Sequence, residues 1–87
     1  MQIYAHPNPF SNTVKIELEG KQPAQLEIYN LRGQRVRSFE AQLLETGRLS
    51  TVWDGLDEAG IRVSSGIYFL RVNQSGQVQM KKLVLLK

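Results

Sequence analysis

The 87-residue chain contains no cysteine, so it can form neither a disulfide framework nor a thiolate metal site. No segment approaches the roughly 18 consecutive apolar residues of a membrane-spanning helix, and we expect no stable membrane insertion. The single histidine, His6, has no recognisable nucleophile motif beside it, which leaves nothing for a catalytic triad or a zinc site. We therefore predict that the protein is not an enzyme and needs no cofactor.

The chain is short and only slightly basic. Eighty-seven residues suffice for one domain with a thin two-layer core, so a deep catalytic cleft is not expected. The net charge of +3 fits an anionic partner without requiring one. Basic residues near Tyr29 could follow a phosphate backbone, but glutamates dilute the patch and we expect no nucleic-acid partner. The basic residues are Arg32, Arg35 and Arg37, and the glutamates are Glu17, Glu27 and Glu40.

Alternation of apolar and polar residues predicts short strands in the first third of the chain. Residues 13–18 place Val14, Ile16 and Leu18 on one face, which is the period-2 pattern of a half-buried strand. Residues 26–29 repeat the pattern after a turn that contains glycine and proline. We expect these two strands to be antiparallel neighbours.

A second turn follows, with Gly33 at the left-handed position. Residues 34–39 continue as a strand whose alternation directs Val36 inward and Arg35 and Arg37 outward. This predicts a hairpin with a basic outer face.

The second half of the chain contains the most apolar strands. Residues 49–53 form a strand that ends at Trp53, the only tryptophan and the best candidate for the centre of the core. Residues 66–72 are apolar on both faces, so this strand is expected to be central in its sheet. Across a turn at Gly76, residues 77–86 form the final strand and pair with it.

Together with residues 3–5, about seven strands predict an all-β, immunoglobulin-like sandwich of antiparallel strands. Residues 40–47 are a connection that a helical turn, a loop or an irregular edge segment could fill. The acidic cluster of Asp54, Asp57 and Glu58 lacks the ligand spacing of a calcium loop, and we interpret it as a solvated turn.

The last seven residues, 81–87, are an apolar run flanked by lysines. A strand at the end of a chain can join or leave a sheet without threading a loop, and its backbone groups can pair with the edge of another chain. A strand-exchanged homodimer is one expectation from this feature.

Several short motifs occur in a particular order along the chain. They are Pro7-Asn8-Pro9-Phe10, residues 28–36, Trp53-Asp54-Gly55, residues 65–69 and the lysine-flanked end. This ordered set resembles the type A C-terminal sorting domain of the bacterial type IX secretion system. Residues 53–68 also resemble the immunoglobulin-like domain of flagellar hook-capping proteins.

The resemblance implies a secretion signal. Such a domain directs an N-terminal passenger across the outer membrane through the type IX translocon and is then removed by a sortase-like peptidase. The expected locations are the periplasm in transit and then the cell surface or the extracellular space. Residues 1–87 would be a single C-terminal sorting domain, taken from a larger secreted protein whose passenger lies before Met1.

The resemblance also implies which residues a partner recognises. They are Pro7, Asn8, Pro9, Leu31, Gly33, Val36, Gly66, Tyr68, Lys81, Lys82, Val84, Leu86 and Lys87. In this interpretation the prolines fix the entry to the first long strand, the glycines allow turns, and Tyr68 and Val84 hold the last strands to the core.

Two other functions remain open from the sequence. An immunoglobulin-like domain can be a structural module that spaces or assembles larger proteins, because one sandwich supports unrelated roles. A carbohydrate-binding module would need an exposed row of aromatic residues, for which Tyr4, Tyr29 and Tyr68 are the candidates.

Overall fold

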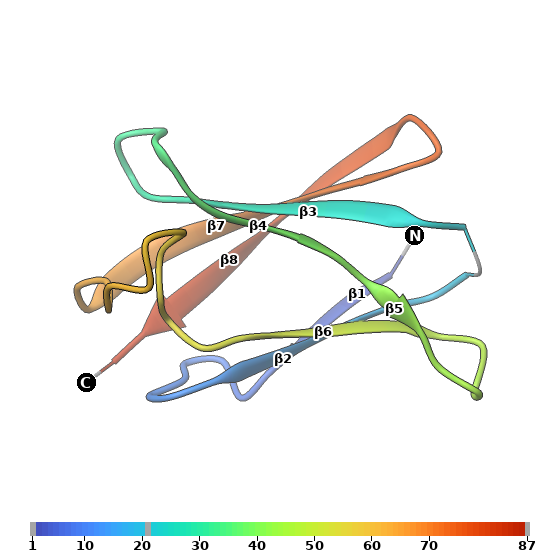
Figure 1. The fold of residues 1–87 in the computed structure, drawn as a ribbon, viewed down its shortest axis with the longest axis horizontal. Helices are drawn as coiled ribbons and strands as arrows, with labels where there is room; N and C mark the ends of the chain where they lie inside the picture. The colour runs from blue at the N-terminus through green and yellow to red at the C-terminus, as the bar shows by residue number, and fades with distance from the viewer. Residues whose placement is uncertain (1, 21, 87) are drawn as a thin grey trace.

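The computed structural model describes residues 2–20 and 22–86, which form eight strands and no helix. Two antiparallel sheets of four strands pack face to face (Figure 1). This confirms the all-β, immunoglobulin-like sandwich, with one strand more than the seven or so expected. The strands are β1 (Ile3–His6), β2 (Val14–Leu18), β3 (Ala24–Tyr29), β4 (Arg35–Glu40), β5 (Gln42–Leu43), β6 (Leu49–Trp53), β7 (Gly66–Gln74) and β8 (Gln77–Leu85).

Sheet A has the strand order β1-β2-β6-β5, and sheet B has the order β4-β3-β7-β8. The prediction that residues 13–18 and 26–29 are neighbours is wrong, because β2 pairs with β1 and β6, whereas β3 pairs with β4 and β7. Alternation specifies which face of a strand is buried, and that face is the same whether the next strand joins its sheet or crosses the sandwich. The additional strand, β5, lies within residues 40–47. Of the three structures that the sequence allowed for this connection, it is the edge segment.

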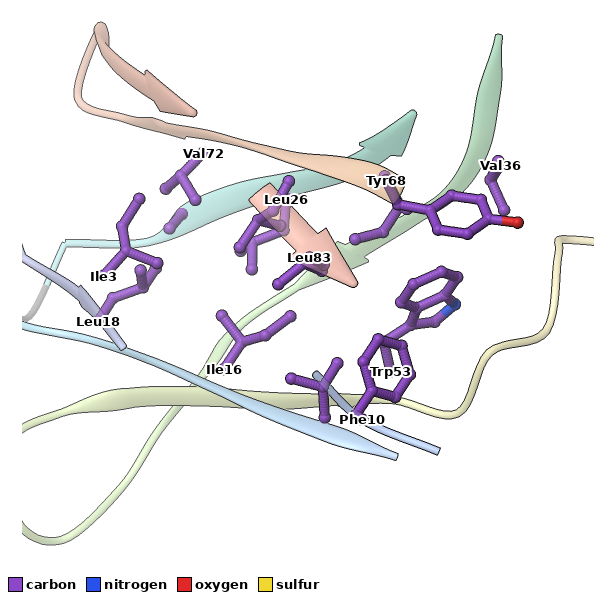
Figure 2. Packing of buried hydrophobic residues seen from close by; sticks show 14 of the residues in the cluster. Ile3, Phe10, Ile16, Leu18, Leu26, Val36, Trp53, Tyr68, Val72 and Leu83 are labelled. Atoms are coloured by element: carbon purple, nitrogen blue, oxygen red, sulfur yellow. The ribbon is translucent and has the colours of Figure 1, made fainter. Parts of the chain in front are cut away.

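The core lies between the two sheets, where the predicted inward faces meet (Figure 2). Val14, Ile16 and Leu18 of β2 are fully buried, and so is Trp53 at the end of β6, as predicted. Strand β7 is central in sheet B, between β3 and β8, which confirms its expected position. Each of these large side chains contributes about 1.5 to 3 kcal/mol by leaving water. The sandwich is therefore stabilised by packing across both sheets.

A β-bulge changes the direction of one predicted side chain in β4. The pairing of β3 with β4 shifts register between Ile28 and Tyr29, so that Ile28 faces Arg37 and Tyr29 faces Arg35. Val36 is buried, as predicted, and Arg35 is exposed. Arg37 is half-buried, and the prediction that it points outward is wrong, because the extra residue in the bulge reverses the alternation.

The last strand also differs from the prediction in which residues it buries. Strand β8 pairs with β7 along its whole length, as expected. Its buried residues are Leu83 and Leu85, whereas Val84 is half-buried on the other face of the strand. Tyr68 lies in the core as predicted, but Val84 does not hold the strand there. The run has apolar residues in both alternations, so the sequence pattern could not tell its two faces apart.

No helix in the part of the chain that the structure describes is long and apolar enough to cross a membrane.

Candidate functional site

Four segments that are far apart in the sequence meet at one end of the sandwich, which we call the C-terminal pole (Figure 1). They are residues 7–10, 30–36, 54–68 and 82–86. Pairing of Gly66 with Leu85, and of Phe10 with Leu85, brings three of these segments together. The hairpin between β3 and β4 forms the fourth, and β1 begins at the opposite end of the molecule.

Most of the residues that the resemblance singled out lie at the C-terminal pole, in two groups. One group follows the edge of β8, and the other lies at two open concavities between the β3–β4 hairpin and residues 57–68. Lys81 lies further from the pole, opposite Leu70, and Lys87 lies outside the described residues. The edge group is Pro7, Asn8, Pro9, Lys82, Val84 and Leu86, and the concavity group is Leu31, Val36, Gly66 and Tyr68, with Gly33 at the tip of the adjoining hairpin.

The edge of β8 is closed by residues 8–10, an arrangement that we call the Asn8 clasp. The Asn8 side-chain Nδ2 donates to the Lys82 carbonyl at 2.9 Å, and its Oδ1 accepts from the Val84 amide at 2.9 Å. The Phe10 amide then donates to the Val84 carbonyl, and the Leu86 amide donates to the Phe10 carbonyl, both at 2.9 Å. Four hydrogen bonds therefore join the first loop of the chain to its last strand.

Phe10 anchors the Asn8 clasp in the core. Its side chain is 2% exposed, and its ring centroid lies 5.5 Å from that of Trp53. Tyr68 approaches the other side of Trp53, edge to face at 5.3 Å (Figure 2). The Tyr68 hydroxyl donates to the Ser64 carbonyl at 2.6 Å, and burial raises the pKa of this phenol. An aromatic cluster thus joins three segments of the pole.

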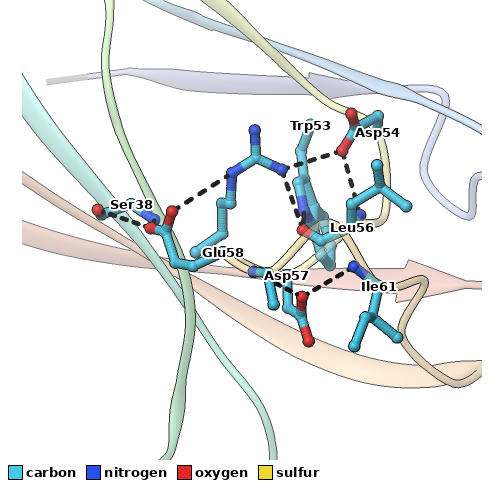
Figure 3. A network of polar contacts seen from close by, with 9 residues as sticks. Ser38, Trp53, Asp54, Leu56, Asp57, Glu58 and Ile61 are labelled. Atoms are coloured by element: carbon cyan, nitrogen blue, oxygen red, sulfur yellow. Dashed lines mark hydrogen bonds and ion pairs between the residues drawn. The ribbon is translucent and has the colours of Figure 1, made fainter.

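The opposite edge of sheet B is closed by a single residue, in what we call the Glu58 bridge. The Glu58 amide donates to the Val36 carbonyl at 3.1 Å. Its carboxylate accepts from the Ser38 amide at 2.8 Å and from the Ser38 hydroxyl at 3.0 Å (Figure 3). These hydrogen bonds lower the pKa of the Glu58 carboxyl, and the charges of Arg37 and Arg35 add to the effect.

Arg37 connects the two sheets at the pole. Its Nη1 donates to Asp54 Oδ1 at 3.2 Å and to the Leu56 carbonyl at 3.1 Å, and its Nε lies 4.0 Å from Glu58. The same Leu56 carbonyl accepts from the Trp53 indole at 3.0 Å (Figure 3). Because its guanidinium crosses from β4 to the loop after β6, Arg37 is a structural residue and not part of a basic outer face.

The hairpin and the loop of residues 54–66 border two open concavities of about 600 and 310 Å³. Tyr68 lines both, Val36 lines the larger, and Leu31 and Gly66 line the smaller. Leu31 is 68% exposed. Gly33, at the tip of the hairpin, has a φ of 80°, the left-handed conformation that the sequence predicted.

The acidic cluster is divided among separate structural tasks. Asp54 pairs with Arg37, Glu58 bonds Ser38, and the Asp57 side chain accepts from the Ala59 and Ile61 amides in its own turn. In residues 2–20 and 22–86, no group of three or more histidine, cysteine or acidic side chains could hold a metal ion. Asp57 therefore stabilises a turn, as the sequence suggested, whereas Asp54 and Glu58 bond residues of strand β4.

The other candidate surfaces do not assemble. Arg35 lies 3.4 Å from Glu27, and Arg71 lies 3.1 Å from the same carboxylate, so these cations are paired within the molecule. The three tyrosines share no surface, because Tyr4 is on sheet A, Tyr29 is on the outer face of sheet B, and Tyr68 is in the core. An exposed aromatic row for stacking on sugars is thus missing from this set.

Two residues at the pole make long-range hydrogen bonds that the sequence did not predict. Asn8 was predicted as a recognition residue, but its bonds to β8 were not, and Glu58 was interpreted only as part of a solvated turn. Both contacts are long-range, and Asn8 bonds residues 74 and 76 positions away. The only local signal is the pair of prolines around Asn8, which marks a segment that lacks backbone donors.

Residues 3–86 match a sequence family described as the secretion system C-terminal sorting domain. The chain belongs to this family. The match covers the ordered motifs except Lys87 and extends from β1 through β8. Its family is a signal rather than a catalyst, which fits the prediction that the domain is not an enzyme. No curated protein sequence matches the chain.

Solved structures with the same fold include two proteins of Porphyromonas gingivalis, one of them described as part of its type IX secretion system. The sorting domain matches PorZ, an essential bacterial surface component of that system, with a TM-score of 0.75, 21% identity and coverage of 98% of this chain and 11% of PorZ. It matches dimeric latent PorU with a TM-score of 0.77, 22% identity and coverage of 97% of this chain and 9% of PorU. The chain therefore spans about a tenth of each protein.

A third structure is the hook-capping protein FlgD from Xanthomonas campestris. The match has a TM-score of 0.64 and 22% identity, and it covers 97% of this chain and 62% of FlgD. At these identities the likeness shows the fold alone.

Proposed function

We propose that the domain acts as a C-terminal signal that directs an attached passenger through the type IX translocon. Membership of the sorting-domain family over residues 3–86 is the observation that carries the proposal. In this proposal an N-terminal passenger crosses the periplasm with the domain attached and reaches the cell surface or the extracellular space. A sortase-like peptidase then removes the domain.

The C-terminal pole is the surface that we propose the machinery recognises. The support is spatial, since motif residues from four segments meet there. Its exposed side chains include Leu31 and Leu86, at 68% and 54% exposure, and the cations Arg32 and Lys82. An apolar surface with cations around it fits a protein partner with acidic groups around an apolar centre.

A reporter fusion tests the function. A periplasm-directed fluorescent protein is joined to residues 1–87 and produced in a bacterium with a type IX system, and the surface fraction is measured by protease accessibility. We expect surface display that disappears when the translocon is deleted. Periplasmic retention in the wild-type strain would refute the proposal and favour a structural module of the hook-cap kind.

A strand-exchanged homodimer also remains a proposal. Exchange of β8 between copies would require the Asn8 clasp to open, because the clasp occupies the edge of that strand. Light scattering on the purified domain over a range of concentrations measures this directly. A monomer at the highest concentration would refute the exchange.

A further inference from the structure

The Asn8 clasp places one side chain where a neighbouring strand would otherwise lie. The Asn8 carboxamide donates to the Lys82 carbonyl and accepts from the Val84 amide, both at 2.9 Å. An adjacent strand would satisfy the same two edge groups with its own backbone carbonyl and amide. The planar carboxamide therefore substitutes for a peptide group of a neighbouring strand.

The prolines on either side of Asn8 explain why a side chain has this task. Pro7 and Pro9 have no N–H, so the backbone at these two positions cannot donate to the edge of β8. The Asn8 side chain supplies the donor and the acceptor instead, and Phe10 continues with backbone bonds to Val84 and Leu86. Prolines also offer no backbone donors to an incoming strand. The clasp therefore closes the edge of β8 without exposing a new strand edge at residues 7–9.

We propose that Asn8 is a positioning residue that makes the export signal conditional on folding of the whole domain. The exposed surface formed by residues 7–9 and 82–86 exists only when the two ends of the chain have met. The partners of Asn8 are 74 and 76 residues away, so the surface requires the entire sandwich between them. The step that depends on folding is recognition of the domain by the export machinery. The proposal rests on the proposed function as a sorting signal.

The arrangement also determines how the last strand is recognised. Since the clasp already pairs the edge of residues 82–86, a partner cannot bind this stretch by strand addition while the clasp is closed. It contacts instead the folded surface, with Lys82 and Leu86 exposed beside Pro7 and Pro9. A free peptide of residues 81–87 lacks this surface and should not compete for recognition.

The decisive experiment separates clasp closure from general stability. Asn8→Leu keeps the shape of the side chain but removes its donor and acceptor. The matched control is Ile3→Val or Ile3→Ala at the other end of the core, whichever has the same melting temperature as Asn8→Leu. The reporter fusion described above is exported at a temperature where all variants are folded, and amide exchange is measured on the isolated domain.

We expect Asn8→Leu to speed exchange at the Val84 and Leu86 amides by about tenfold and to lower the surface fraction below that of the wild type and of the Ile3 control. The Ile3 control should export like the wild type, and an excess of the 81–87 peptide should leave export unchanged. Equal export by Asn8→Leu and the wild type, equal losses in both variants, or competition by the peptide would each overturn the inference. Failure of the wild-type fusion would instead refute the proposed function, and the inference with it.

Discussion

The two edges of sheet B are closed in different ways at the same pole. At β8, Asn8 uses a neutral carboxamide, and the neighbouring Phe10 is buried in the core. At β4, Glu58 uses a charged carboxylate that remains at the solvent surface. Both edges need closing because unpaired strand edges are templates for pairing with other chains. The closure at β8 is therefore anchored in the core and its carboxamide does not titrate. The closure at β4 depends on ionisation of Glu58.

Removing the anchor of the β8 edge should have the largest effect. Phe10→Ala removes a fully buried ring from its contact with Trp53, so we expect a loss of about 3 to 5 kcal/mol in the free energy of unfolding. Denaturant titration followed by circular dichroism measures the loss. Phe39→Ala is the matched control on the β4 side, where the ring is only half-buried. A loss from Phe39→Ala as large as that from Phe10→Ala would contradict the asymmetry between the edges.

Changing the carboxamide itself should have an intermediate effect. Asn8→Asp retains the acceptor for the Val84 amide but removes the donor to Lys82, and it places a carboxylate oxygen against that carbonyl. We expect a loss of about 1 to 2 kcal/mol in the free energy of unfolding, measured by urea titration at neutral pH. Asn8→Ala, which introduces no repulsion, is the control. If Asn8→Asp were as stable as the wild type, the Lys82 hydrogen bond would contribute nothing.

Neutralising the β4 edge should have the smallest effect, and that effect should depend on pH. The pKa of Glu58 is lowered from its usual 4.5, chiefly by the hydrogen bond from the Ser38 amide. Its ionised form therefore adds stability above pH 4.5, and this contribution is lost as the pH falls through the lowered pKa. Glu58→Gln should be less stable than the wild type at neutral pH, and the difference should shrink in acid.

Melting curves from about pH 6 to about pH 3 measure this difference. Asn8→Ala serves as the comparison, because a carboxamide does not titrate and its destabilisation should not follow the pKa of Glu58. A constant gap between the wild type and Glu58→Gln across this range would mean that ionisation of Glu58 does not stabilise the β4 edge.

The sequence predicted the parts of the fold that are encoded locally. Alternation in β2 identified Val14, Ile16 and Leu18 as core residues, and Gly33 was identified as a left-handed turn. It could not assign strand partners, because alternation specifies a buried face and not a neighbour. This is why β2 and β3 were expected side by side although they belong to different sheets.

The errors at the candidate site have the same origin. Regular alternation placed Arg37 on the outer face of β4. The bulge that turns it inward adds one residue to the strand and has no clear local signal in the sequence. Val84 was expected to hold the core on the strength of the resemblance, and the run from Leu83 to Leu86, which is apolar in both alternations, gave no pattern against it. The motif order predicted which segments a partner recognises, and that stays a prediction, but only the folded chain brings Asn8 to β8.

The aromatic cluster has a spectroscopic consequence. Trp53 is the only tryptophan, it is fully buried, and it lies between the rings of Phe10 and Tyr68 with its indole N–H bonded to Leu56. Its emission therefore depends on whether the loop that carries Asn8 remains docked, since release of Phe10 would admit water to the indole. The protein thus contains an intrinsic fluorophore at the pole, and a red shift that precedes loss of the sheet signal would mark that end as the first to open.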